Sequence, residues 1–258
     1  ASGPSANRTD ISVDLGEGRD GVRLQCQNNL KQISLGAHLF DPDTGLDWDL
    51  TAGAPEGAQF DLLAEVGVNP QSDTHPDLYM NIWINQAEIP NSRRDVRSTV
   101  GWRARTGPGD DAIIAKITDL DALTLDLDTG GGHDAIEVHF NPKEITIDKP
   151  VPWNARINTG DGDDTVTVDW TDANTHDPGT TMLQLLDFRI DAGAGNDTVK
   201  AAIISIPRIG QEVVVDFVAD GGAGDDTLAA EFRGTFSSLG LALDGGEGND
   251  HVDVKVDE

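Results

Sequence analysis

The sequence is short of cysteine, of basic residues and of long apolar runs. Its 258 residues include one cysteine, Cys26, so an intramolecular disulfide framework is excluded. No apolar run is long enough to cross a membrane as a helix, and we expect no transmembrane segment. Lysine and arginine number 18 against 46 acidic residues, which gives a net charge of −28. Because this charge repels phosphate backbones, nucleic acid is not expected as a partner.

Signatures of common enzymes are also missing from the sequence. It has no His-Glu-x-x-His zinc motif, no Gly-x-Ser-x-Gly nucleophile elbow and no Walker-type phosphate loop. The six histidines show no metal-ligand spacing. We therefore expect no catalytic residues and a protein that is not an enzyme.

What the sequence does contain is a nine-residue pattern, Asp/Asn-x-Gly-x-Gly-x-Asp-x-aliphatic. One copy runs from Asn158 to Val166. The other copies begin at Asp14, Arg105, Asp128, Asp191, Asp220 and Asp244. Arg105 is the one leading residue that is neither acidic nor an amide. Repeats of this kind decide the architecture of a chain, so they come before any other element.

The repeated residue types suit a hard cation. Alternate glycines permit positive φ angles and a sharp turn, which we expect to point several carbonyl oxygens inward. Calcium takes six to eight oxygens from carboxylates and carbonyls, so two stacked turns would complete one shell. A turn requires the glycines, but its backbone does not require the aspartate that recurs at the seventh position. The expected calcium ligands are the leading and seventh-position residues Asp14, Asp20, Asp111, Asp128, Asp134, Asn158, Asp164, Asp191, Asp197, Asp220, Asp226, Asp244 and Asp250, with the carbonyls of Gly160, Gly162, Gly193, Gly195, Gly222, Gly224, Gly246 and Gly248.

The pattern resembles the RTX (repeats-in-toxin) calcium-binding repeat, Gly-Gly-x-Gly-x-Asp-x-aliphatic-x. The copies at Gly221 and Gly245 carry its double glycine. The resemblance implies a right-handed parallel β-roll with calcium held between successive turns. Family repeats follow one another directly, whereas the seventh-position aspartates from Asp111 to Asp250 recur only every 23 to 33 residues. This spacing indicates one calcium turn per coil.

Apolar residues alternate with polar ones on both sides of each turn. Leu123, Leu125 and Leu127 precede one turn, and Ile136 and Val138 follow it. Period two predicts strands with one buried face, so each coil reads strand, glycine turn, strand, loop. The fold class is therefore all-β, a β-roll or β-helix-like solenoid. An antiparallel β-meander or sandwich, with the glycine turns as hairpin loops, remains the alternative. Inward positions also include Trp102, Trp153 and Trp170, which we expect in the core.

Three regions follow from the spacing of the repeats. Residues 1–26 form a first repeat coil, and residues 99–258 form the repeat solenoid. Residues 27–98 lose the pattern, and they represent either coils with degenerate turns or a small subdomain.

A second, local resemblance covers residues 23–40. This segment is similar to the one that follows the membrane helix in planctomycete pilin-like secreted proteins. Its apolar residues Cys26, Leu30, Ile33, Ala37 and Phe40 also have helical spacing, which predicts a helix over residues 28–39.

The function expected from these features is that of a calcium-binding structural or adhesive repeat protein. The chain begins Ala-Ser-Gly-Pro-Ser without Met, as a mature product does after removal of a leader. Calcium is abundant outside cells, so we expect secretion or a cell-surface location. Expected partners are calcium and either other copies of the chain, assembled into a matrix, surface layer or filament, or a surface glycan or protein. A non-catalytic glycan- or protein-binding module is the alternative. Adaptation to high salt also produces acidic chains, and the sequence leaves both explanations of the charge open.

Overall fold

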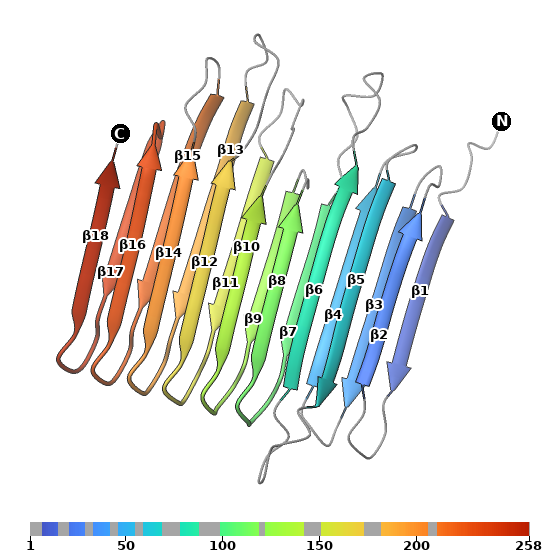
Figure 1. Ribbon diagram of the computed structural model, residues 1–258, viewed down its shortest axis with the longest axis horizontal. Coiled ribbons are helices and arrows are strands. Elements are labelled where there is room, and N and C mark those ends of the chain that lie inside the picture. Colours follow the sequence, from blue (N-terminus) through green and yellow to red (C-terminus); the bar gives the residue numbers. More distant parts are fainter. Residues whose placement is uncertain are drawn as a thin grey trace.

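A computed structural model shows an elongated stack of strands arranged in two facing sheets (Figure 1). The structure describes residues 7–14, 21–28, 33–41, 46–54, 59–68, 78–87, 99–118, 122–141, 151–172, 182–205 and 211–257, with side chains at 49, 100–117, 122–141, 152–171, 183–205 and 212–257. All 18 regular elements in these ranges are strands, which confirms the all-β class.

Successive strands are divided between the two sheets. The first sheet contains, in spatial order, β1 (Asn7–Asp14), β3 (Ile33–Asp41), β4 (Leu46–Ala54), β7 (Thr99–Arg105), β9 (Ala122–Asp128), β11 (Val151–Asn158), β13 (Met182–Asp191), β15 (Gln211–Asp220) and β17 (Ser238–Asp244). The second contains β18 (His251–Asp257), β16 (Thr227–Gly234), β14 (Thr198–Ser205), β12 (Thr165–Asp172), β10 (Ala135–Asn141), β8 (Ala112–Thr118), β6 (Leu78–Ala87), β5 (Gln59–Val68) and β2 (Gly21–Asn28).

From β7 onward the chain alternates strictly between the sheets. Neighbouring strands pair in parallel from β7 to β17 in the first sheet and from β6 to β18 in the second. Parallel pairing with a crossing at every turn makes a solenoid of the β-roll or β-helix type, as the sequence predicts. It excludes the antiparallel meander or sandwich for residues 99–258.

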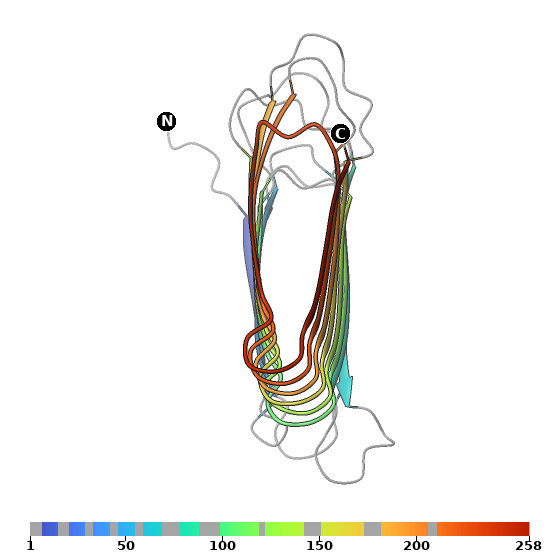
Figure 2. The ribbon, with the colours of Figure 1, turned by 90° about the vertical axis from the view of Figure 1, so that its left-hand side faces the viewer.

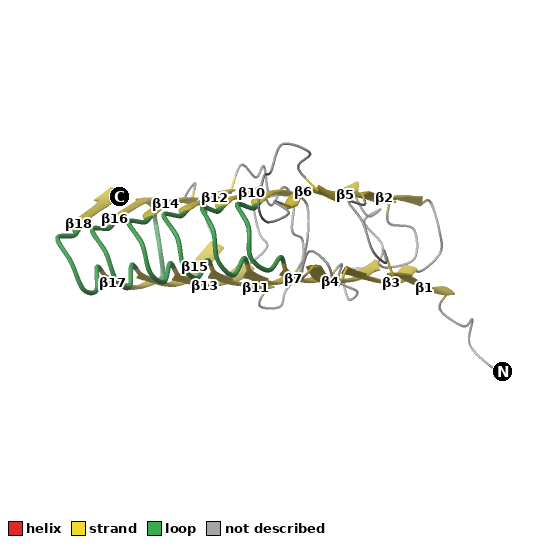
Figure 3. Ribbon diagram, turned by 90° about the horizontal axis from the view of Figure 1, so that it is seen from below, coloured by secondary structure: helices red, strands yellow, loops and turns green. Residues whose placement is uncertain are grey.

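The described glycine turns, from residue 105 onward, lie along one edge of the solenoid. Seen along the stack, the two sheets form two walls and the turns superpose at one end of them (Figure 2). From below, each turn crosses from the first sheet to the second (Figure 3). The turns are also joined by a row of parallel bridges, for example Gly131 to Asp161 and Asp161 to Ala194.

The region from residue 27 to 98 continues both sheets with antiparallel pairs. β3 and β4 form a hairpin in the first sheet, and β5 and β6 form one in the second. β4 then pairs antiparallel with β7, while β6 pairs parallel with β8. Both sheets therefore run through this region into the repeat solenoid.

The helix predicted over residues 28–39 is wrong for the described residues 33–39. They belong to β3, which pairs with β1 in parallel and with β4 in antiparallel register. Ile33, Leu35, Ala37 and Leu39 also alternate with period two. The apolar residues of this segment fit both a helical period and the strand period of two. Such a segment adopts the structure that its neighbours stabilise, and here two strands pair with it.

The core is the narrow layer between the two sheets, and the predicted alternation is confirmed. Trp102, Trp153 and Trp170 are fully buried, as are the large side chains Phe140, Phe188, Phe217 and Phe232. Phe140 contacts Trp153 edge-on with ring centroids 5.5 Å apart, and it stacks on Phe188 at the same distance. Aromatic side chains thus fill the space that shorter residues would leave between the walls.

β17 and β18 lie at the edges of the two sheets. Their inward-facing residues contact a coil on one side only, so Leu239, Leu241 and Leu243 are half-buried. Val252, Val254 and Val256 are 42 to 51% exposed.

Among the described residues, none of the elements is a helix of the length and apolarity that crossing a bilayer requires.

Candidate functional site

The glycines of each turn adopt backbone angles that other residues rarely reach. Third-position glycines such as Gly160 have φ near 90°, and fifth-position glycines such as Gly162 have φ of 137 to 148°. The turns also touch one another, because a Cβ added to Gly162 would lie 1.5 Å from the carbonyl oxygen of Gly132. The backbone of the turns therefore requires both glycines, whether or not a cation is bound.

Third-position glycine carbonyls, three of them expected as calcium ligands, accept hydrogen bonds from neighbouring turns instead. Asp161 N donates to Gly130 O at 3.0 Å, and Ala194 N donates to Gly160 O at 2.8 Å. The carbonyls of Gly193 and Gly222 accept equivalent bonds from Ala223 and Glu247. The fifth-position carbonyls of Gly162 and Gly195 face the glycine of the next turn. Gly246 and Gly248 belong to the last turn, which lies at the edge of the stack between β17 and β18. Stacking thus uses the carbonyl oxygens of Gly160, Gly193 and Gly222, which the sequence assigns to calcium.

The seventh-position aspartates form a continuous inner row. Asp134 N donates to Asp164 Oδ1 at 2.7 Å, and Asp164 N donates to Asp197 Oδ1 at 2.7 Å. The same bond joins Asp111 to Asp134, Asp197 to Asp226 and Asp226 to Asp250. Each carboxylate from Asp134 to Asp250 therefore accepts the amide of its counterpart in the preceding turn. We call these six residues the inner ladder.

The inner ladder is buried, and its carboxylates are only half satisfied. Asp134, Asp164, Asp197 and Asp226 are 1 to 2% exposed. Oδ1 of each accepts one backbone amide, while Oδ2 of each is buried and has no hydrogen-bond partner. An ionised carboxylate buried in this way is costly unless a proton or a cation neutralises it.

Burial shifts the acidity of the inner ladder in the direction expected. Desolvation raises the pKa of Asp134 to about 7, although the nearby Thr129 side chain and the backbone amide of Asp111 oppose it. Desolvation likewise raises the pKa of Asp197 to about 6. The pKa values of Asp164 and Asp226 are raised by the same cause. Neighbouring acids on the row add to this effect for Asp134, Asp197 and Asp226.

The leading residues lie on the other side of the backbone from the inner ladder. Asp191, Asp220, Asp244 and Asn158 are exposed. Asp220 Oδ1 accepts the amide of Gly222 at 3.1 Å, and Asp244 Oδ1 accepts that of Gly246 at 3.2 Å. These two acids therefore cap their own turns.

The first two leading positions of the solenoid bind each other and a neighbour. Arg105 Nε lies 3.3 Å from Asp128 Oδ2, and Asn158 Nδ2 donates to Asp128 Oδ1 at 3.3 Å. Within the described side chains, no group of three or more His, Cys, Asp or Glu residues is placed to hold a metal ion. The structure thus gathers the seventh-position acids into one row and keeps the leading acids apart from it.

Two expected ligands belong to the first repeat. Asp14 ends β1, but its side chain lies outside the described ones, and Asp20 lies outside the described residues.

A second row of side chains, which sequence reasoning missed, lies on the exposed side of the turns. Its members are the sixth-position residues Asp110, His133, Asp163, Asn196, Asp225 and Asn249, which we call the outer ladder. Asp163 N donates to His133 Nδ1 at 3.0 Å, and Asn196 N donates to Asp163 Oδ1 at 2.7 Å. Equivalent bonds join the remaining neighbours.

The sequence contains a pattern from which the outer ladder could have been predicted. Every sixth-position residue from Asp110 onward can accept a hydrogen bond, and acids alternate with His or Asn. This alternation keeps like charges out of adjacent turns. Its bonds also run opposite to those of the inner ladder, because the amide of the later turn is the donor.

The residue at the second position of the motif differs between the earlier and the later turns. In the first three turns of the solenoid the second residue is a buried threonine. Thr106 Oγ1 donates to Thr129 O at 3.1 Å, Thr129 Oγ1 to Thr159 O at 3.3 Å, and Thr159 Oγ1 to Ala192 O at 2.8 Å. Later turns have Ala192, Gly221 and Gly245 at this place, and none of these can donate such a bond.

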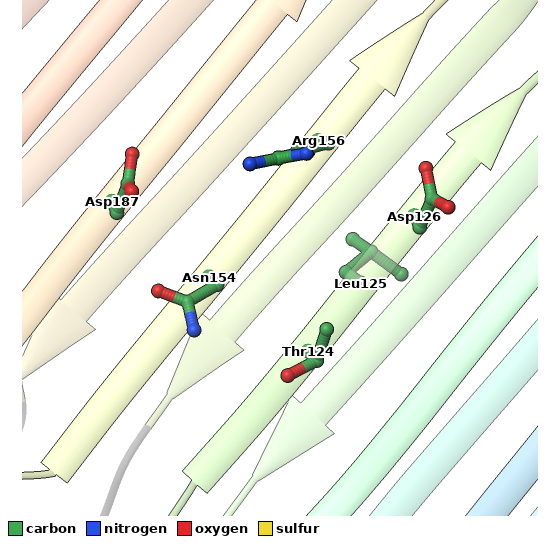
Figure 4. A pocket seen from close by; sticks show the side chains of 6 residues that line it. All are labelled: Thr124, Leu125, Asp126, Asn154, Arg156 and Asp187. Atoms are coloured by element: carbon green, nitrogen blue, oxygen red, sulfur yellow. The ribbon is translucent and has the colours of Figure 1, made fainter.

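The outer face of the first sheet carries a polar hollow of about 330 Å³ (Figure 4). Its lining comes from β9, β11 and β13 and comprises Thr124, Leu125, Asp126, Asn154, Arg156 and Asp187. Both acids of the lining already have partners, since Arg105 binds Asp126 and Arg189 lies 3.0 Å from Asp187. The hollow therefore presents amide, hydroxyl and guanidinium groups beside paired carboxylates.

The chain matches no protein-family model, and comparisons with curated proteins and with solved structures find no significant match. The resemblance to RTX repeats therefore rests on the sequence motif alone.

Proposed function

We propose that this protein is a calcium-stabilised structural repeat protein whose cations neutralise the inner ladder. The observation that carries the proposal is the row of buried Oδ2 atoms on Asp134, Asp164, Asp197 and Asp226, none of which has a hydrogen-bond partner. Carboxylate oxygens are ligands that calcium prefers, and carbonyls and water complete its shell. The residues present therefore fit a hard divalent cation better than they fit an empty turn.

The charge of the chain supports the same proposal. A net charge of −28 destabilises a compact state through self-repulsion. Four acids on one buried row add a local cost, which protons relieve only while the pH stays below the raised pKa values. A divalent cation relieves it at higher pH as well, since it binds the deprotonated carboxylates.

We further propose that the protein works outside the cell or at its surface, as a structural or adhesive component rather than as an enzyme. Calcium is abundant there, and a calcium-dependent solenoid would be rigid where it is needed. β17 and β18 support self-association, because each leaves one edge unpaired within the described chain and Val252, Val254 and Val256 are exposed beside it. A sedimentation profile that stays monomeric at high concentration in calcium would count against this part of the proposal.

The experiment that tests cation binding is a calorimetric titration of chelator-stripped protein with calcium chloride, at low and at high sodium chloride. We expect several ions to bind at both salt concentrations. The melting temperature should rise, because a ligand at 100 times its Kd adds about 2.7 kcal/mol to the free energy of unfolding. Absence of heat and of any thermal shift would overturn the proposal.

A charge-matched pair of variants separates site binding from general screening. One variant replaces Asp134, Asp164, Asp197 and Asp226 with Asn, which keeps each Oδ1 acceptor. The control replaces Asp161, Asp169, Asp216 and Asp253, which are not on the inner ladder, with Asn. Both variants lose four negative charges, and we expect only the first to lose calcium binding. Equal losses would show that the acidity serves adaptation to salt.

The alternative function, a glycan-binding module, is favoured by the polar hollow on the first sheet. Asn154 and Arg156 can donate hydrogen bonds there, and Asp126 and Asp187 can accept them, which suits the hydroxyl groups of a neutral sugar. A glycan array tests this function, with Arg156→Ala and Asn154→Ala as the variants that should lose any signal found.

A further inference from the structure

Both ends of the solenoid have unpaired strand edges, and they lie at opposite ends of the stack (Figure 1). β1 and β2 are the last strands of the two sheets at one end, and β17 and β18 are the last strands at the other. Each of these four strands pairs on one side only within the described chain. Because an unpaired edge is a template for another strand, both ends can take up a further coil.

The strands at the two ends run in the same direction, although antiparallel hairpins lie between them. In the first sheet β1 is parallel to β3, and two antiparallel pairings, β3 with β4 and β4 with β7, restore the direction. In the second sheet the antiparallel pairings of β2 with β5 and of β5 with β6 cancel in the same way. All later pairings are parallel, so β1 is parallel to β17 and β2 is parallel to β18.

The two end coils also match in register. When the paired residues are followed from strand to strand across the first sheet, Asp14 lies at the level of Asp244. Across the second sheet, Gly21 lies at the level of His251. Asp14 and Asp244 are the leading residues of their motifs, and Gly21 and His251 are the eighth residues. β1 therefore ends, and β2 begins, at the levels used by β17 and β18.

Apolar residues occupy the same levels at both ends. Val252, Val254 and Val256 are 42 to 51% exposed, whereas the residues of β16 that pair with them are at most 4% exposed. One further coil would cover these valines as β18 covers β16. The rows through Val252, Val254 and Val256 end in β2 at Val22, Leu24 and Cys26, and the rows through Leu241 and Leu243 end in β1 at Ile11 and Val13.

The last turn carries hydrogen-bonding groups for a following turn. In the inner ladder each amide donates to the carboxylate of the next turn, and in the outer ladder each side chain accepts an amide from the next turn. The equivalent groups of the last turn are the Asp250 amide and Asn249 Oδ1, and among the described residues no turn follows it. A following turn must supply an acid at its seventh position and an amide at its sixth. The motif at residues 14–22 has Asp20 and Arg19 at these positions.

We propose that the C-terminal end of one copy docks on the N-terminal end of the next, with β17 beside β1 and β18 beside β2. The partner is a second copy of this chain, and the new strand pairs are parallel. The interface joins two different surfaces and continues the stack in one direction, so its repetition makes a filament instead of a closed ring. This inference rests on the proposed self-association and deepens it, because it names the surface that receives β17 and β18 and the register in which it does so.

Pairing of two C-terminal ends is the competing arrangement. A two-fold axis that brings two such ends together makes the new strand pairs antiparallel. In the described solenoid the last coil pairs in parallel, and its turn is joined to the preceding turn by the ladder bonds. Two-fold pairing also stops at the dimer, so the two arrangements differ in the size of the assembly as well as in its contacts.

The experiment is a disulfide cross-link between two full-length chains that carry one thiol each. One is the native chain, whose cysteine is Cys26, and the other carries Val256→Cys and Cys26→Ala. Neighbouring strands lie about 4.8 Å apart, which is within the Cα separation that a disulfide spans. The matched control carries Lys255→Cys and Cys26→Ala, because Lys255 lies on the outer face, where its Nζ binds Glu231.

The chains are mixed at high concentration with oxidised glutathione, in calcium and sodium chloride, which screen the repulsion between copies of net charge −28. We expect mass spectrometry to find Cys26 of one chain joined to position 256 of the other. The control should give at least about tenfold less mixed dimer, since its thiol lies on the opposite face of the strand.

Sedimentation supplies a second measurement that needs no cross-link. In calcium, the native chain should form species that grow with concentration beyond the dimer. Val254→Asp places a charge on the apolar row of β18 and should hold the chain as a monomer. Val254 is 42% exposed in the single chain, so we expect this variant to keep the native melting temperature.

The outcomes separate this inference from the proposed function. If the native chain stays monomeric, the proposed self-association and this inference are both wrong. If it assembles but stops at the dimer, if no mixed dimer through Cys26 and position 256 forms, or if the control links equally well, only the head-to-tail arrangement is overturned. Calcium binding is measured separately by calorimetry, so none of these results decides it.

Discussion

The backbone amide of Asp134 donates to Oδ1 of Asp164 across 2.7 Å, although 30 residues separate the two in sequence. The bond connects two successive turns at their buried side. Five such bonds hold the seventh-position aspartates in register along the edge of the solenoid. The aspartate thus has a backbone partner to satisfy as well as a charge to neutralise.

Asp164→Ala and Asp164→Asn separate these two roles. The alanine variant leaves the buried Asp134 amide without an acceptor, which costs about 1 to 3 kcal/mol. The asparagine variant keeps the acceptor and removes a buried charge. We expect it to match or exceed the native stability at pH 8 in chelator. Urea denaturation measures both, and an asparagine variant as unstable as the alanine variant would show that the charge itself holds the turn.

The stability of the calcium-free protein should fall as the pH rises. The folded-state pKa values of Asp134 and Asp197, about 7 and about 6, lie above the ordinary value for aspartate. The folded chain therefore binds more protons than the unfolded chain, and this stability is lost as the pH rises through 6 to 7. We expect a loss of about 2 kcal/mol between pH 6 and pH 8 in chelator. Denaturation curves at both pH values measure it.

Two controls accompany the pH prediction. Asp134→Asn should flatten the dependence, because the pKa of Asp134 is higher than that of Asp197. Saturating calcium should also oppose it, since calcium binds the deprotonated form. Stability that rises between pH 6 and pH 8 in chelator would contradict the assignment of buried protons to this row.

His133 should be replaceable by asparagine but not by alanine. Its Nδ1 accepts the Asp163 amide at 3.0 Å, and Asn196 and Asn249 occupy the same place in other turns. His133→Asn keeps an acceptor, so we expect a change within about 0.5 kcal/mol. His133→Ala loses it and should cost about 0.5 to 1 kcal/mol, because water replaces part of an exposed bond. Thermal unfolding in chelator compares the variants. Equal stabilities would show that the outer ladder does not stabilise the stacking of the turns.

Gly162→Ala should disrupt its turn with or without calcium. Its φ is 143°, and a Cβ would lie 1.5 Å from Gly132 O, which belongs to the backbone of the preceding turn. We expect a loss of more than about 3 kcal/mol, since both the angle and the contact forbid the methyl group. Asp161→Ala is the control, because Ala194 and Ala223 already stand at this exposed fourth position. A stable Gly162→Ala protein would show that the turn can take another path.

The architecture could be predicted because local signals and long-range pairing agree. Leu123, Leu125 and Leu127 repeat with period two before one turn, and Trp153 and Ala155 do so before the next. These residues pair directly in the structure, Trp153 with Leu123 and Ala155 with Leu125. Between residues 27 and 98 the sequence has no copy of the glycine motif that would predict the register, and the two hairpins of that region were not foreseen. Ile33 to Phe40 fits a helix and a strand equally well by its own pattern, and only β1 and β4 decide between them.

The site was harder to predict because one motif holds residues that face opposite ways. Asp191 and Asp197 belong to one turn, yet Asp191 is exposed and Asp197 is buried. The sequence shows their spacing, but it does not show that one side chain is exposed and the other is buried after the chain turns at the glycines. The outer ladder was missed because its members differ in type, Asp163 and His133 for example, and share only the ability to accept a hydrogen bond.

The opposite directions of the two ladders give each turn two different faces. Toward the following turn, a turn such as 158–166 offers the amide of Asp164 and the carboxylate of Asp163; toward the preceding turn it offers the carboxylate of Asp164 and the amide of Asp163. The ladder bonds therefore have the same form at each joint between these turns, provided that the order of the faces is kept. The differing lengths of the coils are taken up away from this edge. A gene in which one whole coil is duplicated or deleted would still encode a continuous stack. The length of the solenoid can therefore change while the backbone hydrogen bonds between turns keep the same form.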